Sequence, residues 1–337
     1  MPTDAPRVMT AHNTLHGLLV QATSAEYLAL CLQAYQLARH VLRERLAQRT
    51  YRNPAVIFDL DETVFDNSAY QAWQLKSGTN FHPVSWNQWC NAGETEAVPG
   101  AVEFVRFVAS AGALPIFITS RDNVTRAATA RNLAAFGLLT TEECAAEEAA
   151  AADQAAGKDV SSHALQTRLF MKPMPNVNVA RPSGPQSYVL ANKFLQRTFV
   201  EQVRGCEVIL SVGDNLADYA EYYGGPSDEN GLPIPGAPHP TAAARRTAVH
   251  QDAQLFGRDF ILIPNATYGG WLRAFEANGL GASDELAYTN TPVREPLAEP
   301  QAPFAYEDAQ GNIATAAAKG PKFREAALRI WAGPVPA

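Results

Sequence analysis

Ala55-Val-Ile-Phe-Asp-Leu-Asp-Glu-Thr63 runs from four apolar residues directly into two aspartates, Asp59 and Asp61, and a threonine. Such a short, continuous apolar run predicts a strand buried on both faces, as in the parallel sheet of an α/β protein. Ligands bind at the carboxyl ends of such strands. Two carboxylates this close repel each other, and Mg²⁺ held together with a phosphate would relieve the repulsion. The alternative is a strand that simply enters an acidic loop.

The composition is that of an ordinary globular protein: 337 residues, 47% hydrophobic and 18% charged. The length allows one large α/β domain with additions or two modest domains. No apolar run approaches the ~20 residues of a transmembrane helix. A net charge of -7 and a pI near 5.5 argue against a nucleic-acid polymer as partner. A small phosphorylated substrate stays compatible, because a metal and one or two cations can meet its charge locally.

The cysteines and the first residues bear on the compartment. Cys31, Cys90, Cys144 and Cys206 show none of the short spacings of zinc or redox sites, so we expect four buried thiols, with one disulfide as the alternative. The first six residues lack a basic segment followed by an apolar one, so we expect either a cytoplasmic chain or one whose leader has been removed.

The N-terminal region is expected to be irregular up to residue 22 and helical after it. Thr23-Ser-Ala-Glu26 has the pattern of a capping box, with Thr23 as N-cap. Apolar residues then recur at steps of three and four, which predicts a helix with one buried stripe that ends near Gln48. The Asn53-Pro54 pair prevents any continuation.

The chain as a whole indicates a Rossmann-like parallel sheet flanked by helices, with a small helical cap. The cap is expected where aromatic residues are frequent and strand alternation is missing, and the insertions where alanine and acids, or glycine and proline, accumulate. The predicted regions are an N-terminal helical region (1–50), a core (51–280), a cap within it (64–99), insertions within it (138–190 and 224–240) and a C-terminal tail (281–337).

A second apolar run, Leu114–Ile118, ends in Thr119 and Ser120. Parallel strands end at the same edge of a sheet, so we expect these hydroxyls near Asp59. The Thr119 hydroxyl can donate a hydrogen bond to a phosphoryl oxygen. A Thr-Ser pair at this point also serves as a helix cap, so the two roles stay open.

A third run, Glu207–Val212, ends in a second acidic cluster that contains Asp214 and Asp218. A helix that begins after the strand would turn Asp218 back toward the strand end, so both acids are expected to face Asp59. Shorter apolar runs predict two more strands, at Leu169–Met171 and Phe260–Ile263.

Together these motifs resemble the haloacid dehalogenase superfamily, and within it the class C acid phosphatases. The resemblance covers roughly residues 20 to 275, with interruptions at the two insertions. It rests on Ser24-Ala-Glu-Tyr27, Gln33-Ala-Tyr35, Asp61-Glu-Thr-Val-Phe-Asp-Asn67, Trp86-x-x-Trp89, Val98-Pro-Gly100, Ile118-Thr-Ser-Arg121, Gly213-Asp-Asn-Leu216 and Leu262-Ile-Pro-Asn-Ala-Thr-Tyr-Gly269.

The resemblance implies a Mg²⁺-dependent acid phosphatase that forms an aspartyl-phosphate. Asp59 would be the nucleophile and Asp61 the acid and then the base of the two steps. Mg²⁺ would be bound by Asp59, the backbone carbonyl of Asp61 and Asp214, with Asp218 orienting its waters. In-line phosphoryl transfer asks for this combination of positioning and charge neutralisation.

The resemblance also assigns the phosphate-binding residues. Thr119 and Ser120 would contact the phosphoryl group together with a lysine. Lys193 is favoured because it stands in an Asn-Lys-x-x-x-Arg pattern at a helix start, and Lys172 is the alternative. Ser120 itself departs from the family, in which many relatives have asparagine there.

The expected substrates are small phosphomonoesters, above all nucleoside 5′-monophosphates. In the family an aromatic ring at the position of Tyr268 stacks on the nucleobase, and Tyr70 in the cap is a second candidate contact. The alternatives are a phosphotransferase on the same scaffold or a surface binding protein with residual phosphatase activity. The family is lipid-anchored, so the resemblance implies a periplasmic or outer-membrane protein, with a homodimer as an option.

Overall fold

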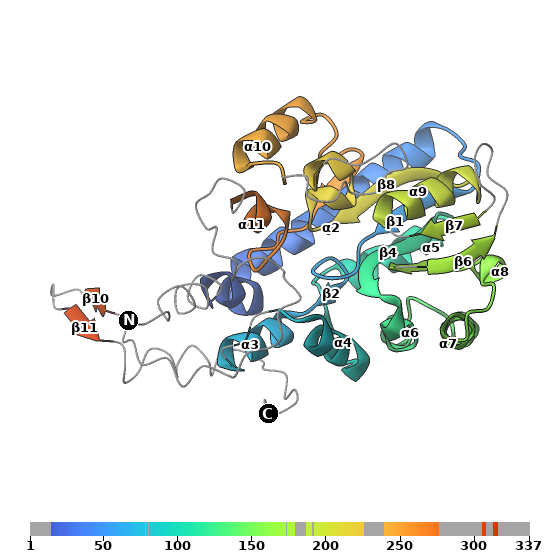
Figure 1. Ribbon diagram of the computed structural model, residues 1–337. Coiled ribbons are helices and arrows are strands. Elements are labelled where there is room, and N and C mark those ends of the chain that lie inside the picture. Colours follow the sequence, from blue (N-terminus) through green and yellow to red (C-terminus); the bar gives the residue numbers. More distant parts are fainter. Residues whose placement is uncertain are drawn as a thin grey trace.

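A computed structural model describes residues 15–77, 79, 81–172, 174–178, 187–190, 192–225, 239–275, 305–307 and 313–315. Its largest sheet has five strands, all parallel, in the order β5-β4-β1-β8-β9 (Figure 1). The strands are β1 (Pro54–Phe58), β4 (Leu114–Asp122), β5 (Leu169–Lys172), β8 (Glu207–Gly213) and β9 (Phe260–Leu262). This sheet confirms the predicted α/β fold class.

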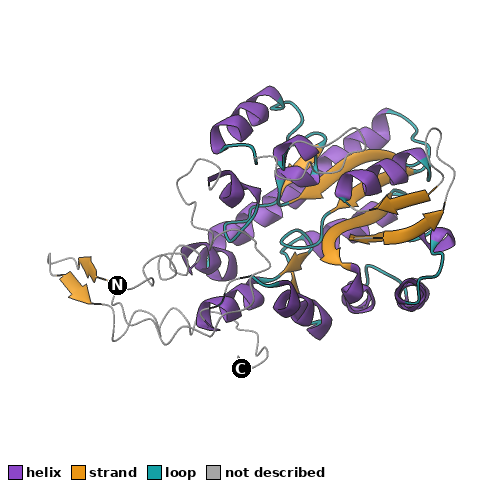
Figure 2. Cartoon of the chain, in the orientation of Figure 1, coloured by secondary structure: helices purple, strands orange, loops and turns teal. Residues whose placement is uncertain are grey.

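Strand β1 is buried on both faces, as its apolar run predicts. Val56 and Phe58 belong to the larger core cluster, in which Phe58 meets Phe104 with ring centroids 5.7 Å apart. Ala55 and Ile57 point the other way, into a second cluster. Helices therefore have to cover both faces, and they do (Figure 2). The larger cluster includes side chains of α2 (Ala25–Gln48) and α5 (Ala101–Ser110). The second cluster includes side chains of α9 (Lys193–Gln202).

The other described elements lie outside the five-stranded sheet. The helices are α3 (Ser68–Ser77), α4 (Pro83–Ala92), α6 (Arg126–Ala135), α7 (Thr141–Ala155), α8 (Ser161–Ala164), α10 (Ala242–Gln251) and α11 (Gly270–Phe275), with short 3₁₀ turns at Asn123–Thr125, Leu216–Asp218 and Glu221–Tyr223. The described residues also contain three antiparallel pairs: β2 (Phe65–Asp66) with β3 (Glu96–Ala97), β6 (Met174–Asn178) with β7 (Ser187–Leu190), and β10 (Ala305–Glu307) with β11 (Ile313–Thr315).

The start of α2 differs from the prediction. Ser24, and not Thr23, is the N-cap, and its hydroxyl accepts a hydrogen bond from the Tyr27 N–H at 2.9 Å. Thr23 lies in the last turn of an additional helix over residues 15–23, where its hydroxyl donates to the Leu19 carbonyl at 2.7 Å. The expectation of irregular structure up to residue 22 was therefore wrong for these residues. The end of α2 at Gln48 is as predicted.

The stretch predicted as an insertion at 138–190 contains one strand of the main sheet. Leu169 and Phe170 pair with Phe117 and Ile118 of β4, so the strand expected at Leu169–Met171 is confirmed as part of β5. Most of 224–240 and of the tail at 281–337 lies outside the described residues. The division of the chain into regions stays a prediction.

The cysteines are free thiols, as the first of the two expectations had it, and three of them are buried. Cys144 differs from that expectation, because it is half-buried. Among the helices that the structure describes, none combines the length and the apolar character needed to cross a bilayer.

Candidate active site

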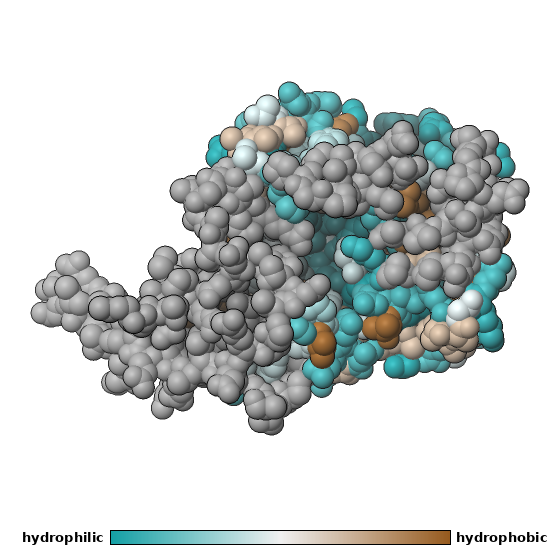
Figure 3. Space-filling view, viewed as in Figure 1, coloured by the Kyte–Doolittle hydropathy of each residue, from teal (hydrophilic) through white to brown (hydrophobic). Residues whose placement is uncertain are grey.

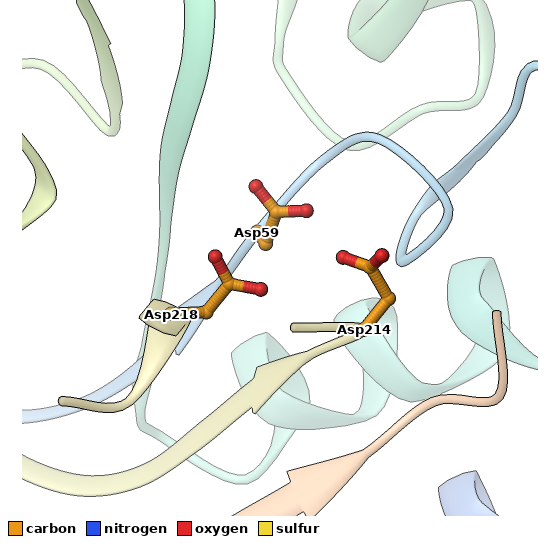
Figure 4. A group of neighbouring side chains, drawn as sticks. All are labelled: Asp59, Asp214 and Asp218. Atoms are coloured by element: carbon orange, nitrogen blue, oxygen red, sulfur yellow. The ribbon is translucent and has the colours of Figure 1, made fainter. Parts of the chain in front are cut away.

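Three carboxylates meet where β1 and β8 end. Asp59 directly follows β1, and its N–H donates to the Val212 carbonyl of β8 at 2.9 Å, which fixes it against the neighbouring strand. Asp214 directly follows β8, and Asp218 ends the 3₁₀ turn after it. Figure 4 shows the three side chains turned toward one another. In the described part of the chain they form one possible metal site, with one oxygen of each within 4.8 Å of the others.

The side chain of Asp218 leaves no room for a side chain at Gly213. A Cβ there would lie 2.6 Å from Asp218 Oδ2 and 2.7 Å from Asp218 Cβ. Oδ2 also accepts the Asn215 N–H at 3.0 Å, which holds the carboxylate over the strand end. A glycine at 213 is therefore a condition for this placement of Asp218.

Lys193 brings a positive charge to the three carboxylates. It begins α9, whose N-cap is Asn192. The Lys193 Nζ donates to Asp59 Oδ1 and, at 2.7 Å, to Asp218 Oδ1. Its side chain is only 16% exposed, so this contact is little screened by water.

Asp61 lies apart from that group and has its own cation. Arg121, fully buried at the end of β4, donates from Nε at 2.9 Å and lies 2.8 Å away through Nη2, both to Asp61 Oδ1. Asn67 donates to the same oxygen at 3.0 Å. Oδ2 keeps one contact in the described residues, the Thr119 hydroxyl at 3.4 Å. Asp61 thus has one oxygen firmly held and the other available for proton transfer.

The cap is connected to Asp61 through Asn67. The Asn67 Oδ1 accepts hydrogen bonds from Trp89 of α4 at 2.8 Å and from Arg121 at 3.3 Å. The guanidinium of Arg121 also lies 4.8 Å from the centre of the Phe65 ring and 5.7 Å from that of Trp86. Aromatic faces at these distances favour a cation, and they help to hold it away from water.

The loop after β9 approaches the site from the other side. Asn265 donates to Asp214 Oδ2 at 2.7 Å, and the Tyr268 hydroxyl donates to Glu62 Oε2. Tyr268 is half-buried. A hydrophilic hollow lies near the middle of the face seen in Figure 3.

Comparison with known proteins shows what the chain is similar to. A profile of the HAD superfamily, subfamily IIIB (Acid phosphatase), matches residues 5–170. The structure of the Class C acid phosphatase from Bacillus anthracis is similar at a TM-score of 0.58 and 27% identity, over 80% of this chain and 90% of that chain. The chain is a phosphomonoesterase that matches the acid phosphatases of the HAD superfamily. A crystal structure of the Bacillus anthracis enzyme with tungstate bound matches this phosphatase at the same TM-score and identity, over 82% of this chain and 93% of that chain.

Crowding of acids in the phosphatase shifts their proton affinities. Burial raises the pKa of Asp59 to about 7, and Asp218 and Asp61 add to the rise, while Lys193 opposes it. Burial raises the pKa of Asp214 well above its ordinary value, and Asp218 and Asp59 add to the rise, while Asn265 and Lys193 oppose it. Burial lowers the pKa of Lys193, but Asp218 and Asp59 more than offset this, so it stays above the ordinary value. One ammonium therefore does not neutralise three carboxylates.

The carboxylate group fits a divalent cation of the kind that HAD phosphatases use. Its donors are oxygens, which hard cations prefer, and the three carboxylates share the single ammonium of Lys193, so positive charge is short. A cation bound there would supply the missing charge and favour the ionised carboxylates.

This shortage predicts a pH-dependent stability of the metal-free phosphatase. Because the folded-state pKa of Asp59 is about 7, above its ordinary value of ~3.9, its contribution is fully present below about pH 4 and is lost as pH rises through 7. We expect the loss to be on the order of a few kcal/mol. Urea unfolding with a chelator at pH 4, 5.5 and 7 measures it, with Asp59→Asn as a non-titrating control. If the free energies of unfolding of the unaltered protein and of Asp59→Asn differ by the same amount at every pH, the prediction is wrong.

The structure brings most of the predicted site residues to one edge of the sheet: Asp59, Asp61, Thr119, Lys193, Asp214 and Asp218. Lys193 contacts Asp59, whereas Lys172 is exposed at the end of β5, with β4 between it and β1. Ser120 lies on β4 next to Thr119 and is exposed.

Tyr70 is placed differently from its prediction. Its ring is wholly buried in the cap, stacked at 5.7 Å on Trp73, and its hydroxyl is hydrogen-bonded to Ser85 at 2.9 Å. The ring packs the cap, so the structure gives no support to a substrate contact by Tyr70.

Sequence reasoning gave no role to four residues that the structure places at the site: Glu62, Asn67, Arg121 and Asn265. All four lie inside the motifs quoted for the family resemblance. The available signal was a polar or charged residue within three positions of a predicted site residue or strand end. Such a signal gives a position, but it does not say which partner the side chain meets.

Proposed function

We propose that this phosphatase hydrolyses phosphomonoesters through an aspartyl-phosphate on Asp59, with Mg²⁺ as its cofactor. The observation that carries the proposal is the meeting of Asp59, Lys193 and the Asp214–Asp218 pair at the end of the central strand. A nucleophile, a phosphate-binding cation and a metal site are the parts that in-line phosphoryl transfer requires. The tungstate bound by the Bacillus anthracis enzyme, an oxyanion, agrees with phosphate binding in this family.

In the first step an Asp59 carboxylate oxygen attacks phosphorus, and the bond from phosphorus to the leaving oxygen breaks. Asp61 donates a proton to that leaving oxygen. Arg121 and Asn67 occupy Oδ1, so Oδ2 is the atom that carries the proton. The Thr119 hydroxyl next to Oδ2 is placed to hold a phosphoryl oxygen.

In the second step Asp61 Oδ2 takes a proton from water, and the water oxygen attacks phosphorus. The bond between phosphorus and Asp59 breaks, which releases phosphate and restores the carboxylate. Lys193 stabilises the phosphoryl charge in both steps, from its position beside Asp59.

Mg²⁺ would be held by Asp59, Asp214 and the backbone carbonyl of Asp61, with Asp218 orienting its waters. When bound, it neutralises charge on the phosphoryl oxygens and among the carboxylates.

Nucleoside 5′-monophosphates are the substrates that Tyr268 favours. Its ring is half-buried, and its loop contacts the site at Asp214 and Glu62. A nucleobase presents a flat face of the kind that stacks on such a ring.

Activity against AMP and glycerol phosphate at pH 5 to 7, with Mg²⁺ and with a chelator, tests the proposed function. We expect both substrates to be hydrolysed with Mg²⁺, AMP with the higher kcat/KM, and activity to disappear with the chelator and return on adding Mg²⁺. Undiminished turnover in the chelator would rule out the metal. Equal kcat/KM for the two substrates would rule out the nucleotide preference.

A further inference from the structure

Glu62 occupies an unusual backbone position for its residue type. It follows Asp61 directly, it is wholly buried, and its φ of 59° lies in the left-handed region. A residue with a Cβ is disfavoured there, and glycine or asparagine would suit the turn better. Burying a carboxyl group also has a cost unless hydrogen bonds compensate it. A side chain that is unfavourable on both counts persists where its own contacts are needed.

Both carboxyl oxygens of Glu62 are used, and by segments far apart in the chain. Oε1 accepts the Asn67 N–H at 2.9 Å, which closes the turn after the catalytic strand. Oε2 accepts the hydroxyl of Tyr268, 206 residues further along. The first contact explains the turn. The second contact serves no local purpose and joins the turn to the loop after β9.

The backbone around Tyr268 does not by itself fix the ring. Gly269 follows with a φ of 139°, a value that other residues rarely adopt, and Gly270 comes next. Before Tyr268 the loop is tied down, since Asn265 Oδ1 accepts the Thr267 hydroxyl at 2.8 Å while the Asn265 amide donates to Asp214. The Tyr268 backbone is held as well, since its N–H donates to Asn265 Oδ1 at 3.4 Å and its carbonyl accepts the Trp271 indole N–H at 3.1 Å. Neither of these contacts involves the ring, so the hydroxyl contact to Glu62 is the hydrogen bond that orients it.

We propose that Glu62 is a positioning residue for substrate selection: it holds the Tyr268 ring in the orientation that receives a nucleobase. The inference rests on the proposed nucleotide function. Glu62 does not touch the reacting atoms. It acts by keeping the ring ordered before the substrate arrives, so that binding does not have to order it.

The variants separate this contact from the turn contact. Tyr268→Phe keeps the ring and removes the hydroxyl. Glu62→Ala removes both contacts, whereas Glu62→Gln preserves both, since its oxygen can accept the Asn67 N–H and its NH₂ can donate to the Tyr268 oxygen. Tyr268→Ala removes the ring itself. Thermal unfolding of each variant shows whether it folds. If Glu62→Ala does not fold, Tyr268→Phe still tests the proposal.

The readout is selectivity, the ratio of kcat/KM for AMP to kcat/KM for glycerol phosphate. We expect Tyr268→Phe and Glu62→Ala each to lower it about three- to tenfold through a higher KM for AMP. The double variant Glu62→Ala/Tyr268→Phe should lose no more selectivity than Glu62→Ala alone, because the contact with the Tyr268 hydroxyl is already absent in Glu62→Ala. Glu62→Gln should stay within about twofold of the unaltered protein. Tyr268→Ala should lower the selectivity roughly five- to a hundredfold.

Two failures are distinguishable. If Tyr268→Ala lowers selectivity but Tyr268→Phe does not, the ring stacks without help from Glu62, and the positioning role is wrong while the nucleotide function stands. If Tyr268→Ala leaves selectivity unchanged, both are wrong. Losses in Glu62→Ala and Tyr268→Phe that add in the double variant would also overturn the proposal, because they would come from separate contacts.

Discussion

Asp59→Asn is expected to lower kcat by about a thousandfold or more while the protein stays folded. An amide fills the same space as the carboxylate but cannot attack phosphorus, and loss of a nucleophile costs several powers of ten in rate. Steady-state kinetics with Mg²⁺ measures the rate, and circular dichroism checks the fold. Burial of Asp59 at the end of the central strand leaves little room for water to take over as nucleophile.

Asp61→Asn provides the matched comparison. It should also be slow, but with Asp59 intact it should accumulate labelled aspartyl-phosphate from a substrate labelled at phosphorus, because the second step lacks its base. Asp59→Asn should acquire no label. Residual turnover above a few per cent in Asp59→Asn would mean that the covalent mechanism is wrong.

Lys193→Met should damage both stability and activity. The lysine contacts Asp59 and Asp218, so its removal leaves carboxylates without their cation. Removing one partner of a buried ion pair destabilises a protein by about 3–5 kcal/mol, and removing a phosphoryl-binding donor lowers kcat by roughly 10²- to 10³-fold. We expect Mg²⁺ to restore much of the stability but not the rate, since the metal can replace the charge but not the donor.

Urea unfolding and kinetics, each with and without Mg²⁺, measure the two effects. Lys172→Met is the control, because an exposed substitution at the end of β5 should change stability by no more than about 0.5 kcal/mol. A larger loss of activity in Lys172→Met than in Lys193→Met would reverse the assignment of the phosphate-binding lysine.

Much of the fold was predictable because its signals are local. The apolar run before Asp59 indicates a doubly buried strand by itself, and so do the runs before Thr119 and Asp214. Since parallel strands end at one edge, the convergence of these residues follows without knowing any other contact. The family and the phosphatase activity were likewise predictable from the motifs, and both are confirmed.

The other features depend on contacts between different parts of the chain. The sequence alone does not state these contacts. Aromatic residues in the cap were evident, but Tyr70 is buried because α3 and α4 pack their rings on one another. Arg121 was evident as a cation at a strand end, and its contact with Asp61 depends on Asn67 and Phe65 beside it. The choice of Ser24 over Thr23 as N-cap depends on the additional helix over residues 15–23, whose last turn includes Thr23.

Lys193 lies 134 residues after Asp59, the carboxylate that it contacts. A ribosome adds ~5–20 residues per second, so the nascent chain carries Asp59 and Asp61 for on the order of ten seconds before the lysine and the second acidic cluster emerge. During that interval β1 has no β8 beside it and Asp59 has no Lys193 opposite it, although Arg121, the cation that contacts Asp61, emerges earlier. The catalytic centre therefore cannot be complete before Asp218 has emerged, and the recovery of activity should follow the pairing of β1 with β8.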